Sequence, residues 1–292
     1  MSARVIDGKA AAQAIRAGLQ ADIAALGRAQ GRPPKLAIVT CAPAAAAEAY
    51  LRAKLKAAAE TGILAQAYPC PADGEAESLR RLIASLSVDE TIDGIIVEQP
   101  LPPHLMTPGA ESLIASAIAP GKDVEGMNPL SYGVFFRCKS ASEIQAARVF
   151  PPCTVSAMIE LLRATLAPVA GREAVVVGRS GILGRPAAHY LSALDATVTL
   201  CHSRTADLAA HVRRADILFA CVGRAHAIKG DWVKPGAVVI DAGMNRLADA
   251  WVGDVEFAAA ARRAAFISPV PGGVGPVTTA VVLANTVRAA QR

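Results

Sequence analysis

Short apolar runs of strand length alternate with helix-forming stretches along this 292-residue chain, in two separate sets. The first set has strand-like runs at 35–40, 63–69 and 93–98 and helix-forming stretches at 48–62 and 76–87. The second set has strand-like runs at 173–178, 196–201, 216–223 and 236–243 and helix-forming stretches at 182–194 and 206–215. Such alternation is typical of parallel sheets with helices on both faces. The chain is therefore predicted to be an α/β protein that binds ligands at the carboxyl ends of its strands.

The segments outside these two sets decide the predicted domain boundaries. Residues 15–29 are expected to form one amphipathic helix, and residues 277–292 the last helix of the chain. The stretch 127–153 shows no regular pattern, so a crossover between domains is expected there. These assignments predict a first α/β domain at 1–145, completed by the helix 277–292, and a Rossmann-like dinucleotide-binding domain at 146–276.

Composition and charge argue against several classes of protein. Hydrophobic residues make up 53% of the chain, which is ample for packed cores, yet no apolar run reaches membrane-spanning length. The net charge of +5 is not gathered into a Lys/Arg-rich run, so no nucleic-acid partner is expected. A mild positive balance also suits an enzyme with anionic substrates. The five histidines show no metal-ligand spacing, so no metal is expected.

The cysteines and the N-terminal stretch bear on the compartment. None of the six cysteines forms a Cys-x-x-Cys pair, and several stand in apolar runs. The first sixteen residues are charged throughout, unlike a signal peptide. The resulting expectation is a cytoplasmic protein with reduced, structural thiols.

A glycine-rich loop follows the first strand of the second set. The stretch VVVGRSGILGRPAA (175–188) joins an apolar run to a helix through Gly178, Gly181 and Gly184. Glycines at a helix N-terminus allow the backbone to approach a phosphate. The spacing departs from the usual G-x-G-x-x-G, and a plain strand–turn–helix is the alternative.

The end of the next strand indicates which dinucleotide is bound. NAD enzymes usually place an acid there, but this chain has CHSRT (201–205), with Ser203 and Arg204. A serine and an arginine suit the 2′-phosphate of NADP, and Arg179 is a second candidate for a phosphate. NADP is therefore favoured over NAD. A surface arginine at a helix start is the other interpretation of Arg204.

Tyr50 and Lys54 stand four residues apart in a predicted helix and so share one face. Taken alone, the pair is most simply a solvent-facing lysine beside a half-buried tyrosine. The remaining motifs of the chain change this interpretation.

Eight motifs in a fixed order carry a family resemblance. They are AYLRAKLKAAAETGI, GIIVEQPLP, PGKDVEGMNP, PPCT, VVVGRSGILGRP, CHSRT, VGDVEF and SPVPGGVGPVTTA. Over nearly its whole length the chain resembles the bifunctional methylenetetrahydrofolate dehydrogenase/methenyltetrahydrofolate cyclohydrolase family. The resemblance implies two α/β domains with a cleft between them and a homodimer. It also implies NADP-dependent oxidation of 5,10-methylenetetrahydrofolate and hydrolysis of the methenyl product to 10-formyltetrahydrofolate.

The resemblance further implies a role for each matching position. Lys54 would be the catalytic lysine, and Tyr50 would flank the folate. The loop 269–276 would line the folate pocket through Pro269, Pro271, Gly272 and Gly273. The residues that would contact NADP are Gly178, Arg179, Ser180, Ser203, Arg204 and Met244.

Two carboxylates depart from the family pattern. Glu98 stands where the family usually has Gln, and Glu125 stands where it usually has Asp. Glu98 ends an apolar run and is expected to face Lys54 in the folate site. The alternative is a solvated Glu98, with Gln99 taking the usual glutamine's place through a bulge. The prolines that follow disfavour this alternative, because a one-residue slip reverses every side chain.

These departures predict a change in activity. A neutral amide hydrogen-bonds a lysine without fixing its charge, whereas a carboxylate stabilises the ammonium form, which is a poor base. Glu125 adds a methylene and so moves the carboxylate expected to bind the pterin ring. We therefore expect weakened cyclohydrolase activity, with the dehydrogenase retained or shifted to another reduced pterin. A dehydrogenase of a non-folate substrate and a non-catalytic paralogue that binds folate or nucleotide remain alternatives.

Overall fold

The computed structural model describes residues 2–41, 45–71, 74–99 and 101–292, without the side chains of residues 45–47, 49, 50 and 108. The chain forms two compact units. Unit 1 comprises residues 1–13, 136–146 and 154–278, and unit 2 comprises residues 14–135, 147–153 and 279–292. Each unit is built on its own parallel sheet, so the predicted α/β class with two domains is confirmed.

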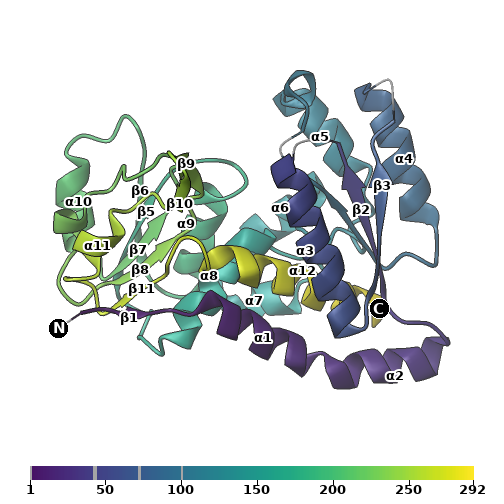
Figure 1. The fold of residues 1–292 in the computed structure, drawn as a ribbon, viewed down its shortest axis with the longest axis horizontal. Helices are drawn as coiled ribbons and strands as arrows, with labels where there is room; N and C mark the ends of the chain where they lie inside the picture. The colour runs from purple at the N-terminus through teal and green to yellow at the C-terminus, as the bar shows by residue number, and fades with distance from the viewer. Residues whose placement is uncertain (1, 42–44, 72–73, 100) are drawn as a thin grey trace. The chain divides into compact units, whose positions relative to one another are not determined.

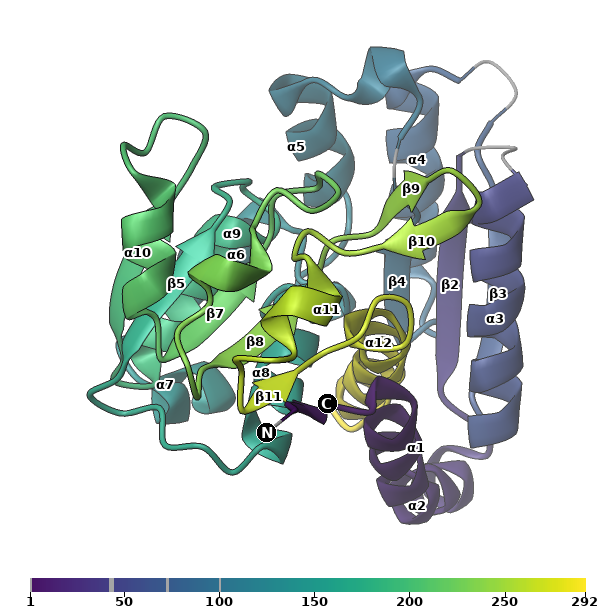
Figure 2. The same ribbon diagram turned by 60° about the vertical axis from the view of Figure 1, so that its left-hand side comes forward.

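Unit 2 contains a three-stranded sheet in the order β3-β2-β4, formed by β2 (Lys35–Thr40), β3 (Leu64–Pro69) and β4 (Gly94–Val97). Its connections are α3 (Ala45–Thr61) after β2 and α4 (Ala76–Val88) after β3 (Figure 1). The unit also contains α5 (Pro108–Ser116) and most of α12 (Val274–Ala290). Figure 2 shows α12 nearly end-on, so that it crosses the direction of β4. Gly94 of β4 has no room for a Cβ because Val124 and Thr286 of α12 press on it.

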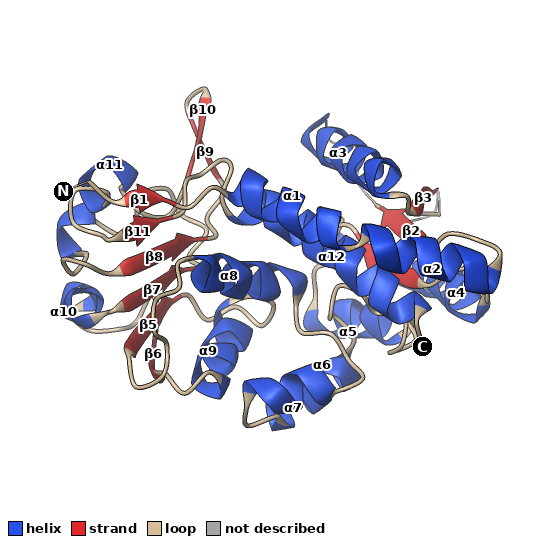
Figure 3. Cartoon of the chain, turned by 90° about the horizontal axis from the view of Figure 1, so that it is seen from below, coloured by secondary structure: helices blue, strands red, loops and turns tan. Residues whose placement is uncertain are grey.

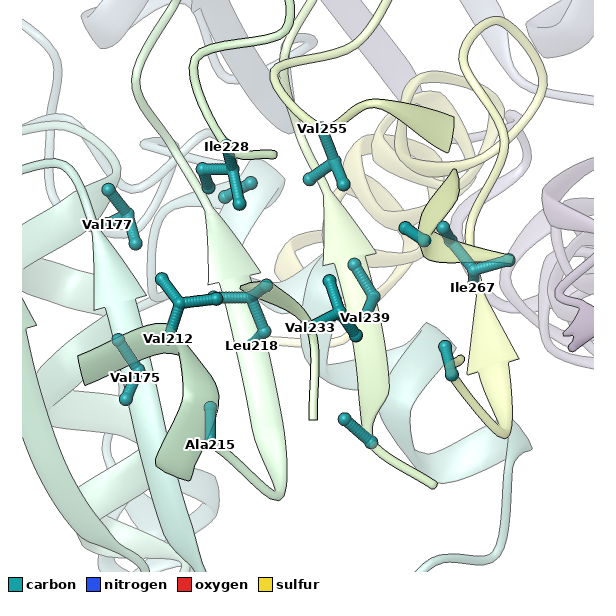
Figure 4. Packing of buried hydrophobic residues seen from close by; sticks show 14 of the residues in the cluster. Val175, Val177, Val212, Ala215, Leu218, Ile228, Val233, Val239, Val255 and Ile267 are labelled. Carbon is teal, nitrogen blue, oxygen red and sulfur yellow. The ribbon is translucent and has the colours of Figure 1, made fainter. Parts of the chain in front are cut away.

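Unit 1 contains a six-stranded sheet in the order β1-β11-β8-β7-β5-β6, and every neighbouring pair is parallel. Its strands are β1 (Arg4–Val5), β5 (Glu173–Val177), β6 (Thr197–Cys201), β7 (Ile217–Ala220), β8 (Val238–Asp241) and β11 (Phe266–Ile267). Figure 3 shows α8 (Cys153–Ala164) and α9 (Gly184–Ala193) on one face and α10 (Leu208–Arg214) and α11 (Phe257–Ala260) on the other. On one face, apolar side chains of the sheet such as Val175 and Leu218 pack in one cluster with Val212 of α10 (Figure 4).

Two of the predicted elements are wrong. The single helix expected at 15–29 is two helices, α1 (Gly8–Gly18) and α2 (Gln20–Gln30), that break at Leu19. Glycine is a weak helix former, and the break follows Gly18. The Leu19 N–H donates to the carbonyl of Arg16, three residues before it, instead of to the carbonyl four residues before it as in an α-helix. The stretch 127–153, expected to be irregular, contains α6 (Pro129–Arg137) and α7 (Ala141–Ala146).

The apolar pattern of the sequence did not predict the short elements, because periodicity needs more residues than they contain. Helix α6 begins with Pro129, and the Asn128 side chain accepts the Leu130 N–H at 2.7 Å, which caps it. Helix α7 has six residues, and β1 and β11 have two each, too few for periodicity to register. The antiparallel hairpin β9 (Asn245–Leu247) and β10 (Ala250–Val252) was also not predicted.

Both sheets reverse their strand order at one strand. In unit 1 the chain passes from β5 to β6 on one side and then to β7 on the other. In unit 2 it passes from β2 to β3 and then to β4. Ligands of open α/β sheets bind at the carboxyl ends of strands at such reversal points. The loops after β2, β4, β5 and β7 are therefore the places to look for a site.

Among the described residues, no helix combines the length and apolar character needed to cross a membrane.

Gly178→Ala should destabilise unit 1. At this position, φ is +127°, a region that only glycine adopts readily, and an added Cβ would collide with the Cys221 backbone carbonyl. We expect the free energy of unfolding to fall by about 1–3 kcal/mol or more, measured by thermal and chemical denaturation. Gly181→Ala is the matched control, since nothing lies within 4 Å of its added Cβ. Equal losses in both variants would contradict the close approach at Gly178.

Candidate active site

Lys54 and Glu98 form an ion pair in unit 2. Lys54 lies on α3, and Glu98 follows β4 directly, where its N–H donates to the Val39 carbonyl of β2 at 2.9 Å. The Lys54 Nζ lies 2.5 Å from Glu98 Oε1, and their side chains are only 12% and 15% exposed. The prediction that Glu98 faces Lys54 is therefore confirmed. Gln99 is exposed and accepts the Leu101 N–H instead, so no bulge brings it to the lysine.

The short distance and low exposure make this pair unlike a surface ion pair. Attraction between opposite charges strengthens as solvent is removed, and a charge-assisted hydrogen bond of this length is among the stronger ones. Each charge also compensates the other for lost hydration. The pair therefore brings two opposite charges together where little solvent screens them.

Glu125 is the third member of the cluster. Burial raises the pKa of the Glu125 carboxyl to about 7, and the nearby carboxylates of Glu98 and Asp123 act in the same direction. The Lys54 charge and a hydrogen bond from the Val97 backbone oppose this rise in the pKa. Glu125 is thus within electrostatic reach of both members of the ion pair. It changes its charge near neutral pH, unlike an ordinary glutamate.

A turn at 123–128 positions Glu125. The buried Asp123 carboxylate accepts the backbone N–H groups of Met127 and Asn128, each at 2.9 Å. Gly126 has φ +73°, and a Cβ there would meet the Phe150 carbonyl at 2.5 Å. Burial raises the pKa of Asp123, whereas these backbone hydrogen bonds favour its charged form. Sequence reasoning missed Asp123, although the spacing Asp-x-x-Gly is a turn signal.

Cys153 and Asn285 hold the backbone beside Glu125, and neither was predicted from the sequence as part of the site. The Cys153 N–H donates to the Glu125 carbonyl at 3.0 Å, and its thiol donates to the Val124 carbonyl at 3.0 Å. Asn285 of α12 donates to the same Val124 carbonyl at 2.9 Å. Burial raises the pKa of Cys153 well above its ordinary value, so this thiol is structural.

The other predicted folate residues lie on α3 and in the loop before α12. Tyr50 lies on α3 one turn before Lys54, but its side chain and Pro100 lie outside the described residues. Pro269, Pro271, Gly272 and Gly273 lie in unit 1, in the loop that leads into α12. In that loop Gly272 has φ +102°, and a Cβ on Gly273 would meet the Pro269 carbonyl at 2.5 Å. The folate role of these residues remains a prediction.

The glycine-rich loop of unit 1 has the close packing expected of a phosphate cradle. It runs from the end of β5 to Gly184, the first residue of α9. A Cβ on Gly184 would collide with the Gly178 carbonyl, so glycine is needed at both ends of the loop. Ser180 accepts the Gly184 N–H at 3.3 Å, and Arg179 and Ser180 are exposed. Exposed backbone N–H groups at a helix N-terminus suit a phosphate group.

The end of β6 lies beside this loop, because the Gly178 N–H donates to the Cys201 carbonyl at 2.8 Å. Ser203 and Arg204 follow at once and are both exposed. No acid stands at 201–205 to take a ribose hydroxyl. Met244, which follows β8, is 44% exposed. These residues fit a dinucleotide that carries a 2′-phosphate.

Two buried aspartates that sequence reasoning did not single out organise the neighbouring loops. Asp254 accepts three successive N–H groups after β7, those of Val222 at 2.6 Å, Gly223 at 3.0 Å and Arg224 at 2.9 Å. Asp241, at the end of β8, accepts N–H groups of Gly243, Asp254 and Val255. Burial raises the pKa of Asp241 to about 7. Only the bond from the Gly243 N–H to Asp241 has a local signal, since an aspartate commonly accepts the backbone N–H two residues on, whereas the partners of Asp254 lie about thirty residues away.

A metal centre is not found in the part of the chain that the structure describes: no group of three or more His, Cys, Asp or Glu residues there could hold an ion.

Comparison with known proteins matches both units. The family model for the tetrahydrofolate dehydrogenase/cyclohydrolase catalytic domain matches residues 6–125, and that for the NAD(P)-binding domain matches residues 152–292. The chain is 44% identical to the bifunctional protein FolD of Geotalea daltonii, covering 99% of each chain. It is also 44% identical to the bifunctional protein FolD of Moorella thermoacetica, covering 100% of each chain.

Two solved structures resemble the whole chain. One is the bifunctional FolD methylenetetrahydrofolate dehydrogenase/cyclohydrolase of Campylobacter jejuni, with a TM-score of 0.91 and 35% identity over 99% of each chain. The other is the FolD of Trypanosoma brucei complexed with NADP and an inhibitor, with a TM-score of 0.91 and 39% identity. That alignment covers 100% of this chain and 98% of the other.

Glu125 should titrate near pH 7, and Glu98→Gln should lower that midpoint by removing a neighbouring negative charge. Because the pKa is raised from 4.5 in the folded state, the folded chain holds a proton that the unfolded chain has lost. Stability from this group is therefore greatest below pH 4.5 and falls as the pH rises to about 7.

Carbon NMR of labelled glutamate carboxyls measures the midpoint, with Glu125→Gln identifying the signal. Glu77→Gln is the control, since Glu77 is surface-exposed and its pKa is lowered beside Arg80. A Glu125 midpoint that stays unchanged in Glu98→Gln would show that the two carboxyls are not coupled.

Proposed function

The chain belongs to the tetrahydrofolate dehydrogenase/cyclohydrolase family, and we propose that it oxidises 5,10-methylenetetrahydrofolate to 5,10-methenyltetrahydrofolate with NADP as the cofactor. We further propose that it hydrolyses the methenyl product to 10-formyltetrahydrofolate at a reduced rate. The observation that carries the second proposal is the short Lys54–Glu98 ion pair beside Glu125, because it fixes the charge of the lysine expected to move protons.

NADP would be held in unit 1. The fit is supported by the close packing of the glycines at 178 and 184, by the exposed loop residues Arg179 and Ser180 between them, and by the exposed Ser203 and Arg204 after β6. NADP, when bound, takes up two electrons and one proton from the one-carbon group of the substrate. The guanidinium of Arg204 supplies the positive charge for the 2′-phosphate, and the backbone between Gly178 and Gly184 supplies donors for the diphosphate.

The hydrolytic step depends on proton transfer. Water adds to the methenyl carbon and loses one proton, which leaves a hydroxyl on that carbon. The bond from the carbon to one folate nitrogen then breaks as that nitrogen receives a proton and the hydroxyl loses its own to become the formyl oxygen, so one proton is released overall. A lysine performs both transfers only if it spends part of the cycle as a neutral amine. Glu98 opposes this form, since removing the Lys54 proton would leave a mostly buried carboxylate without its partner. Hydrolysis should therefore be slower here than with a neutral amide at position 98.

Glu125 is proposed to bind the donor groups of the pterin ring. A carboxylate accepts two parallel N–H donors, which suits the amino and ring N–H groups of a pterin. Because burial raises its pKa to about 7, Glu125 is only partly ionised at neutral pH. Folate binding should then strengthen as the pH rises through 7. Tyr50, Pro269, Pro271, Gly272 and Gly273 are proposed as further folate contacts.

The assembly and compartment are also part of the proposal. The family resemblance supports a homodimer, which light scattering on the purified protein would test. A cytoplasmic location is supported by six cysteines that are all free thiols, as is usual in a reducing compartment.

A shifted substrate is the second candidate function. The charged pair Lys54–Glu98 and the longer side chain of Glu125 both alter the groups that would face a folate. A dehydrogenase of a modified pterin would use the same nucleotide loop. A non-catalytic paralogue is less well supported, since Lys54 and the whole nucleotide loop are retained.

The test of the proposed function uses the purified protein with each folate separately. NADP reduction with 5,10-methylenetetrahydrofolate, together with slow loss of 5,10-methenyltetrahydrofolate above background, is the expected result. Equally fast activities would overturn the proposed weakening. Folate binding without turnover would favour the non-catalytic paralogue, and failure to bind folate would favour another substrate.

Glu98→Gln should raise the rate of methenyl hydrolysis about tenfold or more while changing NADP reduction much less. The reason is that the amide keeps a hydrogen bond to Lys54 but no longer stabilises its charge, and about 1.4 kcal/mol of relief gives a factor of ten. Stopped-flow absorbance of the methenyl compound measures this rate. Glu60→Gln, a change in an exposed ion pair on the same helix, is the control. No gain in Glu98→Gln would count against the electrostatic explanation.

Arg204→Ala should raise the KM for NADP by about 10- to 100-fold, the loss expected for a charged hydrogen bond of about 1.5–3 kcal/mol. The KM for NAD should change little, because NAD has no 2′-phosphate. Arg213→Ala, which removes an exposed arginine from α10, controls for net charge. An equal rise in KM for both nucleotides would show that Arg204 does not recognise the 2′-phosphate.

A further inference from the structure

Cys41 and Cys70 follow two neighbouring strands of unit 2. The strands β2 and β3 are parallel and in register up to Thr40 opposite Pro69. The ladder continues one step further, since the Cys70 N–H donates to the Thr40 carbonyl at 2.7 Å. Cys41 and Cys70 therefore stand opposite each other on the same face of the sheet. Both also pack against the same hydrophobic cluster.

The two thiols are in contact. Burial raises the pKa of Cys41 to about 12, and the charge of Cys70 and a hydrogen bond to its sulfur add to the rise. Neighbouring strands lie about 4.8 Å apart. A disulfide requires Cα atoms about 4.4–6.8 Å apart. Both residues are half-buried, so small molecules reach them.

We propose that Cys41 and Cys70 are a redox site that closes reversibly to an intramolecular disulfide. With a peroxide as oxidant, the Cys70 sulfur takes one oxygen, the O–O bond breaks and water leaves. The Cys41 sulfur then attacks the Cys70 sulfur, the S–O bond breaks and a second water leaves. Two thiols and one hydrogen peroxide thus give one disulfide and two waters, and a small dithiol reverses the change.

The remaining cysteines do not compete for the oxidant. Cys138, Cys153, Cys201 and Cys221 are buried, and burial raises the pKa of each thiol. A low fraction of thiolate and poor access both slow oxidation. Oxidation is therefore directed to the one pair that is partly exposed and already aligned.

The disulfide would lie at the edge of the sheet that carries the ion pair. Glu98 bonds through its N–H to Val39, two residues before Cys41, and α3 with Lys54 begins four residues after Cys41, at Ala45. Cross-linking the ends of β2 and β3 would restrain the end of β2, whose Val39 carbonyl accepts the Glu98 N–H. A reversible change in folate KM on oxidation follows, and this consequence, unlike the disulfide itself, rests on the proposed function.

The test treats the full-length protein with a small excess of hydrogen peroxide, blocks free thiols with an alkylating reagent and measures intact mass. The expected result is a loss of two alkylated thiols per chain and, without alkylation, a mass lower by about 2 Da, both reversed by dithiothreitol. Peptide mapping should show Cys41 linked to Cys70. Cys41→Ser and Cys70→Ser should each abolish the effect, whereas Cys138→Ser should leave it unchanged.

Three outcomes would overturn the proposal. These are retention of all six thiols, an undiminished loss in Cys41→Ser, or a stable gain of about 16 Da per oxygen on Cys70 without a cross-link. The mass measurement needs no folate, so an inactive protein would refute the proposed function and leave the disulfide to be judged separately.

Discussion

Parallel pairing of β2 with β3 and β4 is the constraint on which the site of unit 2 depends. In a parallel sheet all carboxyl ends meet at one edge, so residues far apart in sequence become neighbours there. At this edge Glu98, which follows β4, bonds through its N–H to Val39 near the end of β2, the strand that precedes α3. The helix then carries Lys54 back over the sheet, and the two charges meet at 2.5 Å. A register change of one residue in β4 would turn Glu98 to the opposite face.

The ion pair also determines what surrounds it. Its two charges act on the pKa of Glu125 in opposite directions, since Lys54 lowers it and Glu98 raises it, while burial has the largest effect and favours the protonated form. The turn at 123–128 fixes Glu125 through backbone groups bonded to Asp123, while Cys153 and Asn285 fix the adjoining carbonyls. Distant parts of the chain thus hold one carboxyl whose charge changes near neutral pH. A site built this way responds to the proton concentration without a histidine.

The candidate nucleotide site of unit 1 is shaped by close backbone packing, whereas the candidate site of unit 2 is built from charged side chains. Gly178 and Gly184 are held so closely that a side chain at either position would collide with backbone, while Arg179 and Ser180 in the loop between them are exposed. Buried Asp254 accepts three backbone N–H groups of the loop after β7, and buried Asp241 accepts one after β8 and two after β10. These carboxylates act on structure rather than on chemistry, because each bonds only to neighbouring backbone and, for Asp254, to the Asn245 amide as well.

The sequence by itself determined the α/β class, the positions of the main strands, the nucleotide loop and the pairing of Glu98 with Lys54. Period-two and period-3.6 apolar patterns and glycines are local signals, and they located the strands and the nucleotide loop. The pairing of Glu98 with Lys54 came from the resemblance of the ordered motifs to a known family. It failed where signals were too short or non-local: the break at Leu19, the helices within 127–153, and the roles of Asp123, Cys153 and Asn285. Only the tertiary structure decided these roles, and the alignment of Cys41 with Cys70, because burial and strand register belong to the folded chain and not to any one segment.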